Sequence, residues 1–196
     1  PKYWLWVGGV FSALEPLPIL LMVIDTMNHV RHRHAQIVNP HTWTIAVGCA
    51  VMHLIGAGIW GFAHTLPQIN YYTHGSQVTV SHGHLAFFGA YALLNITVFY
   101  FAMPQMKGVT QYSPTRGKFA FWTMTSSMML MGLTFGIAGV LQSYLERVLG
   151  MGYMTAQSYM QLWMAITMVL GCCFLIGLVV MVIDLLAPRP ATPRIE

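Results

Sequence analysis

Two histidines stand two residues apart in the run Ser81-His82-Gly83-His84, inside a long apolar stretch of the chain. Ionisable residues within a membrane-spanning segment are costly and usually functional. Successive residues of an α-helix turn by about 100°, so His82 and His84 differ by about 200° and face opposite sides of one helix. Two imidazoles placed in this way cannot readily bind the same ion. The spacing instead predicts that each binds its own planar cofactor, with the helix standing between the two.

The alternative is that both histidines only hydrogen-bond to neighbouring helices, which is the usual role of a lone histidine in a membrane span. The residues around them favour the ligand interpretation. Gly83 and Gly89 would leave room for a macrocycle against the backbone, and Phe87 and Phe88 would supply apolar walls. A haem iron accepts axial imidazole ligands. We therefore expect the two histidines to bind haem iron.

Glu15 is the next candidate. It lies about twelve residues into the first apolar stretch, roughly 18 Å from its outer end. A carboxylate at this depth indicates proton handling or metal coordination, although a neutral, hydrogen-bonded carboxylic acid is the alternative. Pro16 and Pro18 lack amide hydrogens, so the carbonyls of Ser12 and Leu14 would lose their helical partners. We expect a kinked turn that admits water, as a proton relay requires.

The remaining histidines and carboxylates within or near the apolar stretches give weaker signals. His53 and His64 would lie about 16 Å apart along a helix, so they cannot ligate one ion. We expect His53 to be a packing side chain. His74 precedes the paired histidines in an outer loop, from which it could reach a haem propionate. Asp25 and Asp184 lie near helix ends, and we expect both to be solvated there.

One loop gathers much of the other basic charge. It carries two arginines and four histidines, namely Arg31, Arg33, His29, His32, His34 and His41. Polybasic segments beside a membrane helix are attracted to anionic lipid headgroups. We therefore expect this loop to face membrane lipid and not to form a metal site.

The elements that position these residues are membrane helices. Of the 196 residues, 56% are hydrophobic and 7% are charged, against roughly 25% charged residues in soluble domains. With a mean hydropathy of +0.60, this composition excludes a soluble enzyme and a disordered tail. Five stretches reach the roughly 20 residues that a spanning helix needs, approximately 3–27, 42–66, 78–103, 119–145 and 159–186. We predict an all-α fold, a single membrane domain of five transmembrane helices.

The charges between these helices indicate how the chain crosses the membrane. Lysines and arginines follow the first, third and fifth helices, whereas the opposite side carries only Lys2 and Arg147. The positive-inside rule then places the N-terminus outside and the tail, residues 187–196, in the cytoplasm. The net charge of +4 thus reflects topology, and we expect no nucleic-acid partner.

Glycines recur within two of the predicted helices. Gly132, Gly136 and Gly139 lie in the fourth helix, and a second set, Gly56, Gly58 and Gly61, lies in the second. Small residues let membrane helices approach closely. We expect tight helix packing at these positions and no chemistry.

Three segments closely resemble the large subunit of bacterial nitric oxide reductases, in the haem–copper oxidase superfamily. They read FSALEPLP at 11–18, HTLPQINYYTHG at 64–75 and VSHGHLAFFGAY at 80–91. The resemblance extends over essentially the whole chain, whose five helices are similar to the last five of the family's twelve. It implies a place in the bacterial inner membrane, with the N-terminus periplasmic.

The resemblance also implies a role for each candidate. His82 would be the proximal ligand of the high-spin haem b, where nitric oxide is reduced, and His84 one of the two axial ligands of the low-spin haem b. Glu15 would help to deliver protons to the binuclear centre. Electrons would come from a cytochrome c subunit. The reaction would join two NO molecules, with two electrons and two protons, into nitrous oxide and water.

The family's site also needs residues that we do not find in this sequence. Its non-haem iron is held by three histidines and a glutamate of earlier helices, which also provide the second ligand of the low-spin haem. We expect the remaining N-terminal helices, in a longer subunit or a partner chain, to complete the site. Two alternatives stay open: an oxygen reductase of the same superfamily, and a non-catalytic haem-binding membrane subunit.

Overall fold

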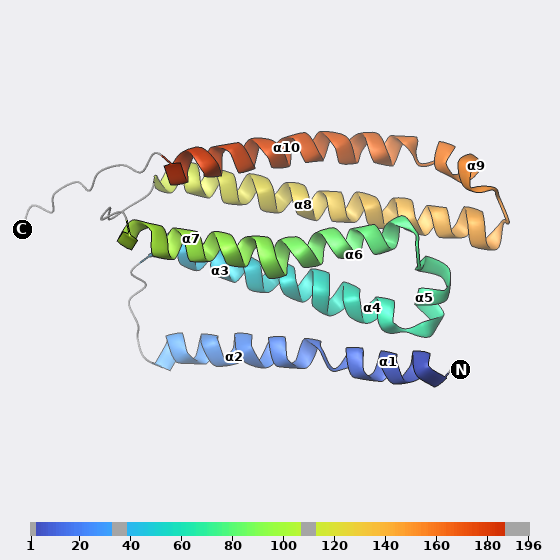
Figure 1. Ribbon diagram of the computed structural model, residues 1–196, viewed down its shortest axis with the longest axis horizontal. Helices are drawn as coiled ribbons and strands as arrows, with labels where there is room; N and C mark the ends of the chain where they lie inside the picture. The colour runs from blue at the N-terminus through green and yellow to red at the C-terminus, as the bar shows by residue number, and fades with distance from the viewer. Residues whose placement is uncertain (1–2, 33–38, 107–112, 187–196) are drawn as a thin grey trace, which may run out of the picture.

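Five long helical segments run back and forth along one axis in the computed structural model of the chain (Figure 1). The structure describes residues 3–32, 39–106 and 113–186. The segments long and apolar enough to cross a membrane are Tyr3–His32, Pro40–Thr65, Gln77–Met106, Pro114–Val148 and Gln161–Leu186. The predicted all-α membrane fold is therefore confirmed, with segment ends that differ from the predicted bounds by up to about five residues.

Most segments consist of shorter elements joined end to end. The first contains α1 (Tyr3–Ala13) and α2 (Pro16–His32), and the second contains α3 (Pro40–His53), the π-helical turn η1 (Leu54–Trp60) and α4 (Gly61–Thr65). The third contains α6 (Gln77–Phe87), the π-helical turn η2 (Phe88–Ala92) and α7 (Leu93–Met106). The last two contain α8 (Pro114–Ser143), η3 (Tyr144–Val148) and α10 (Gln161–Leu186). Two short helices, α5 (Pro67–Thr73) and α9 (Tyr153–Ser158), lie at the end of the bundle that carries the N-terminus (Figure 1).

Three of the segments begin at residues whose side chains cap a helix. Asn39, Ser76 and Ser113 each accept a hydrogen bond from a backbone N–H two or three residues further on. These bonds satisfy donors that the first helical turn leaves free. Pro40 and Pro114 occupy the first helical turn, where a missing N–H costs nothing. Local sequence therefore sets where the second, third and fourth segments begin.

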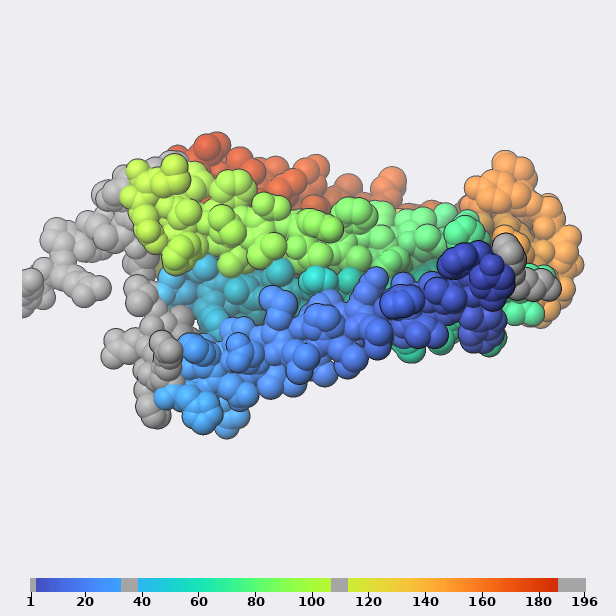
Figure 2. Space-filling view, turned by 60° about the horizontal axis from the view of Figure 1, so that its bottom comes forward, coloured from blue at the N-terminus to red at the C-terminus, as the bar shows by residue number. Residues whose placement is uncertain are grey.

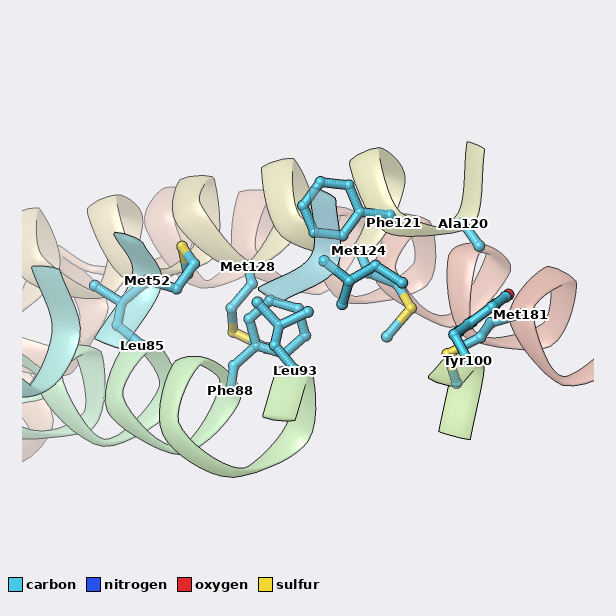
Figure 3. Packing of buried hydrophobic residues seen from close by; sticks show 11 residues of the cluster. Met52, Leu85, Phe88, Leu93, Tyr100, Ala120, Phe121, Met124, Met128 and Met181 are labelled. Carbon is cyan, nitrogen blue, oxygen red and sulfur yellow. The ribbon is translucent and has the colours of Figure 1, made fainter. Parts of the chain in front are cut away.

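The apolar core lies between the second, third, fourth and fifth segments (Figure 3). Its buried members are aliphatic, aromatic and methionine side chains, namely Ile45, Met52, Leu85, Phe88, Leu93, Tyr100, Ala120, Phe121, Met124, Met128 and Met181. The four segments share this one cluster, so they form a single packed unit. Exposed leucine, isoleucine and valine side chains cover the outer faces, as expected of a surface in contact with lipid.

The first segment packs differently from the others. It lies on the outside of the bundle, against the second segment (Figures 1 and 2). No residue of α1 or α2 is buried. The side chains that it does turn inward face the second and third segments across a cavity, described below.

The predicted close packing at glycines is confirmed where α8 crosses α6. A methyl group at Gly139 would come within 2.6 Å of the carbonyl carbon of Gln77, and one at Gly132 would meet the Leu85 side chain at 2.6 Å. The Ser81 hydroxyl lies at the same crossing, fully buried, and donates to the Gly132 carbonyl at 2.6 Å. Small residues and interhelical hydrogen bonds together hold these two helices.

Asp184 corrects one prediction. We expected it to be solvated at a helix end, but its side chain is 0% exposed. One carboxylate oxygen pairs with Arg116 Nε at 2.9 Å and accepts from the Ser113 N–H at 3.2 Å, while the other accepts from the Tyr100 hydroxyl at 3.1 Å. A buried carboxylate is stable only when it is paired in this way. Asp25, by contrast, is exposed as expected.

His41 corrects a second prediction, that of a lipid-facing basic loop. It lies in the first turn of α3, and its ring meets Tyr100 edge-on, with centroids 4.7 Å apart. Both ring nitrogens are buried. His29 and His32 are exposed at the end of α2, as predicted. Arg33 and His34 of the same predicted loop lie outside the described residues. The bundle thus buries the ring nitrogens of His41, whereas His29 and His32, which are close to it in the sequence, are exposed.

Candidate functional site

His82 lies near the middle of α6 and points toward the second segment. Its Nδ1 lies 2.8 Å from the carbonyl oxygen of Gly56. A carbonyl can only accept, so Nδ1 carries the hydrogen in this bond and Nε2 keeps its lone pair. A metal-binding histidine is usually fixed in this way, with one ring nitrogen held by a carbonyl and the other directed at the metal. The geometry at His82 therefore fits an axial ligand.

The wide turn of η1 shapes the second segment around this ring. Gly56 and Gly61 both border His82, since a methyl group at Gly61 would lie 3.1 Å from His82 Cε1. In a straight α-helix, residues five apart differ by about 140° and could not both face one side chain. A π turn closes with bonds between residues five apart, which brings them toward one side. The irregular turn thus places a hydrogen-bond acceptor at Gly56 and a close approach of backbone at Gly61 against the same imidazole.

His84 faces away from His82, toward α8. Its Nδ1 lies 2.9 Å from the carbonyl oxygen of Val80 on its own helix, which again leaves Nε2 as the available nitrogen. Its ring lies beside Phe135, with centroids 5.0 Å apart. The two half-buried histidines thus have different neighbours on different segments. The helix places them on opposite faces, as their spacing predicts.

A cavity of about 720 Å³ opens on the His82 side of α6. This volume lies within the range of roughly 300–1,000 Å³ that small-molecule and cofactor sites occupy. The first, second and third segments and α5 line it, with side chains that include Trp4, Ser12, Glu15, His53, Ala57, His64, Tyr71, His82, Ala86, Phe87 and Tyr91. The walls combine apolar and aromatic side chains with several polar ones, among them a carboxylate and three imidazoles. Such a site suits a large planar molecule that His82 holds at one point.

Glu15 lies on the wall of the same cavity, in the break between α1 and α2. The predicted kink is present, because the helix stops at Ala13 and restarts at Pro16. The carbonyls of Ser12 and Leu14 are not left unpaired as expected. They accept from the N–H groups of Glu15 and Leu17 at 3.2 and 3.1 Å, in tighter turns three residues long. The break costs little hydrogen bonding and presents a carboxylate to the cavity.

The residues that flank the two histidines divide into two groups. Phe87 lines the cavity, and no atom lies within 4 Å of a methyl group placed at Gly83. Phe88, however, is 3% exposed and packs in the core against Phe174, and Gly89 lets the backbone of α3 approach η2. The expectation that Phe88 and Gly89 would border a macrocycle was therefore wrong. The packing of the third segment on the second uses them instead.

Two histidines of the second segment also border the cavity. His53, expected to be a packing side chain, lies on its wall. His64 also lies there, and its ring is 5.5 Å from that of His82 between centroids, with planes tilted by 36°. No role was predicted for His64 from the sequence. One signal was available, because His64 opens the second of the segments that resemble the reductase family.

His74 lies just beyond α5, exposed to solvent and outside the set of residues that line the cavity. Its predicted contact with a haem propionate stays a prediction. Within residues 3–32, 39–106 and 113–186, no three His, Cys, Asp or Glu side chains gather to hold one metal ion.

These features together describe a multi-pass helical membrane protein whose central helix presents one histidine on each of two faces. A family model described as "Cytochrome C and Quinol oxidase polypeptide I" matches residues 1–173. The chain belongs to this haem–copper oxidase family, as the resemblance in its sequence indicated.

A curated relative narrows the comparison within that family. The chain is 42% identical over 187 residues to a protein of Stutzerimonas stutzeri that is named as a nitric oxide reductase subunit. The match covers 91% of this chain and 40% of the relative. The chain therefore spans well under half the length of the curated relative that it matches.

Proposed function

We propose that this chain forms the haem-binding part of the catalytic subunit of a nitric oxide reductase. The proposal rests on the arrangement of the two histidines in the third segment. His82 and His84 each use Nδ1 to bond a backbone carbonyl and keep Nε2 available on opposite faces of one helix. Family membership and the likeness to a nitric oxide reductase subunit support the class of reaction.

In this proposal His82 would hold the iron of a high-spin haem b, and His84 would hold the iron of a low-spin haem b. When bound, haem supplies an iron that changes oxidation state. The chain orients each imidazole before the iron arrives, since the carbonyls of Gly56 and Val80 fix the ring tautomers. Such bonds also raise the basicity of the coordinating nitrogen. The exposed His74 is proposed to bind a propionate at the end of the bundle that carries the N-terminus.

Glu15 is proposed to deliver protons to the reduction site. Its carboxylate shares a cavity with His82 and lies in the break between α1 and α2. A carboxylate on a cavity wall within a membrane is a typical member of a proton relay. It accepts a proton on one oxygen and releases it toward the cavity, where the product water forms.

The complete reaction joins two NO molecules, two electrons and two protons into nitrous oxide and water. We propose that a cytochrome c subunit provides the electrons, and that helices from outside this chain provide the non-haem iron ligands and the second ligand of the low-spin haem. The protein lies in the bacterial inner membrane, with the α1 end of the bundle periplasmic and the opposite end cytoplasmic. The lysines and arginines that follow the first, third and fifth segments support this orientation.

A second candidate function is oxygen reduction. The description of the matching family names cytochrome c and quinol oxidases, and this favours it. A non-catalytic haem-binding protein is the third. The metal content of the complex purified from membranes separates them. Two b-type haems with non-haem iron support nitric oxide reduction, copper supports oxygen reduction, and one haem or none supports the non-catalytic protein.

The ligand assignment is tested by spectra of the full-length protein with one histidine removed. We expect His82→Ala to abolish the high-spin haem signal and keep the low-spin one, and His84→Ala to do the reverse. His29→Ala is the matched control, because this histidine is exposed at the end of α2 and does not line the cavity. Retention of both haem signals in His82→Ala would refute the assignment.

A further inference from the structure

The second membrane segment brings an additional imidazole against His82. The rings of His64 and His82 are 5.5 Å apart between centroids, and their planes differ by 36°. Neighbouring rings at this separation are in van der Waals contact across their faces or edges. His64 is therefore in direct contact with the proposed haem ligand but is not itself one of the two ligands.

The position of His64 is fixed from several sides. It lies in α4, one turn after Gly61, and the helix ends at Thr65 because Pro67 follows. Asn70 donates from its side-chain amide to the His64 carbonyl at 2.7 Å, so the end of α4 is held. The backbone that carries the His64 ring is thus held in place beside His82.

The imidazole of His64 is not explained by packing alone. Its Nε2 is buried and has no hydrogen-bond partner among the residues that the structure describes. A buried polar atom without a partner costs free energy, so an apolar side chain would pack here at lower cost. A leucine side chain, however, would not place a flat ring beside the His82 ring.

Two contacts of His82 with the second segment lie along one edge of its ring. The hydrogen bond from Nδ1 to Gly56 fixes one point on the ring edge. The backbone of Gly61 approaches the same edge closely, since a methyl group placed there would lie 3.1 Å from His82 Cε1. A ring held only at an edge can still tilt, and tilt changes how its Nε2 meets a metal.

We propose that His64 is a positioning residue that holds the plane of the His82 imidazole by ring contact and so sets the bond between His82 Nε2 and the haem iron. The inference rests on the proposed function, since it requires haem on His82. His64 acts through His82 and does not touch the reacting atoms. The contact adds a ring neighbour to an imidazole whose contacts with Gly56 and Gly61 lie along one edge.

The test replaces His64 in the full-length protein purified from membranes. His64→Leu removes the ring, and His64→Phe keeps a ring without the nitrogens. His29→Leu is the matched control, because His29 is exposed at the end of α2 and does not line the cavity. The readouts are the iron–imidazole stretching band of the reduced high-spin haem in resonance Raman spectra, and the midpoint potential of that haem. The low-spin haem signal reports that the bundle is intact.

We expect His64→Leu to move and broaden the stretching band and to shift the midpoint potential, while His64→Phe and His29→Leu stay close to the wild type. A wild-type band in His64→Leu would overturn the proposal, and so would an equal shift in His64→Phe. If His64→Leu binds neither haem, His64→Met, which also lacks a ring, carries the same test. Failure of the proposed function is recognised separately, because His82→Ala would then keep both haem signals.

Discussion

The most specific prediction about stability concerns the buried carboxylate of Asp184. Its substitution by asparagine keeps the shape of the side chain and removes the charge. In the native structure the carboxylate accepts hydrogen bonds from Arg116 Nε at 2.9 Å, the Tyr100 hydroxyl at 3.1 Å and the Ser113 N–H at 3.2 Å. These contacts join α7, α8 and α10 at the end of the bundle opposite to the N-terminus (Figure 1). Asp184→Asn therefore tests whether the charge itself holds three helices together.

The expected magnitude follows from the number of charged bonds. A hydrogen bond to a charged acceptor contributes roughly 1.5–3 kcal/mol and a neutral one roughly 0.5–1.5 kcal/mol, so neutralising the acceptor costs about 1 kcal/mol for each bond. Three hydrogen bonds are affected, and we expect Asp184→Asn to lower the free energy of unfolding by about 3 kcal/mol. Asp184→Ala also leaves buried partners unpaired and should cost about 3–5 kcal/mol.

The assay is reversible unfolding of the full-length protein in mixed detergent micelles, followed by circular dichroism. Asp25→Asn is the matched control, since Asp25 is exposed on α2 and its variant should match the wild type. Neutral hydrogen bonds between membrane helices contribute about 0.6 kcal/mol on average. A loss of that size or smaller in Asp184→Asn would refute the role of the charge. In a double-mutant cycle with Tyr100→Phe, simple additivity would refute the pairing.

Two further predictions concern helix packing and proton delivery. Gly139→Ala places a methyl group within 2.6 Å of the Gln77 carbonyl carbon and should destabilise the crossing of α6 and α8 by about 1–3 kcal/mol in the same unfolding assay. Gly171→Ala, which meets no atom within 4 Å, should leave stability unchanged, and equal effects at both sites would contradict the close approach at Gly139. Glu15→Gln should slow steady-state NO consumption at least tenfold with haem content intact. Full activity in that variant would exclude Glu15 from proton delivery.

Much of the fold could be predicted from the chain alone because membrane helices are specified locally. Each spanning segment must satisfy its own backbone hydrogen bonds, so apolar length is nearly sufficient to find it. The kink at Pro16 follows from a missing amide hydrogen, and the opposite faces of His82 and His84 follow from helical periodicity. None of these inferences needs knowledge of which helices are neighbours.

The incorrect predictions from the sequence share one physical cause. Asp184 and His41 lie near helix ends, where solvation is the usual state, but tertiary contacts with Tyr100 bury them instead. Phe88 and Gly89 stand beside the paired histidines in the sequence, and yet they face the core and α3. A residue near a helix end or beside a motif can contact water, lipid or protein. Its neighbours in the tertiary structure decide which of these it contacts.

The amino-acid sequence alone specifies a five-helix membrane protein with two imidazoles on opposite faces of its third segment. These are consequences of hydrophobic length and of about 100° of rotation per residue, both of which are local. The tertiary arrangement was needed to show that Glu15, His64 and His82 border one cavity, because they come from three segments. The π turn at Gly56 shifts the register of the second segment toward His82, and no spacing rule for a regular helix would have placed His64 beside it.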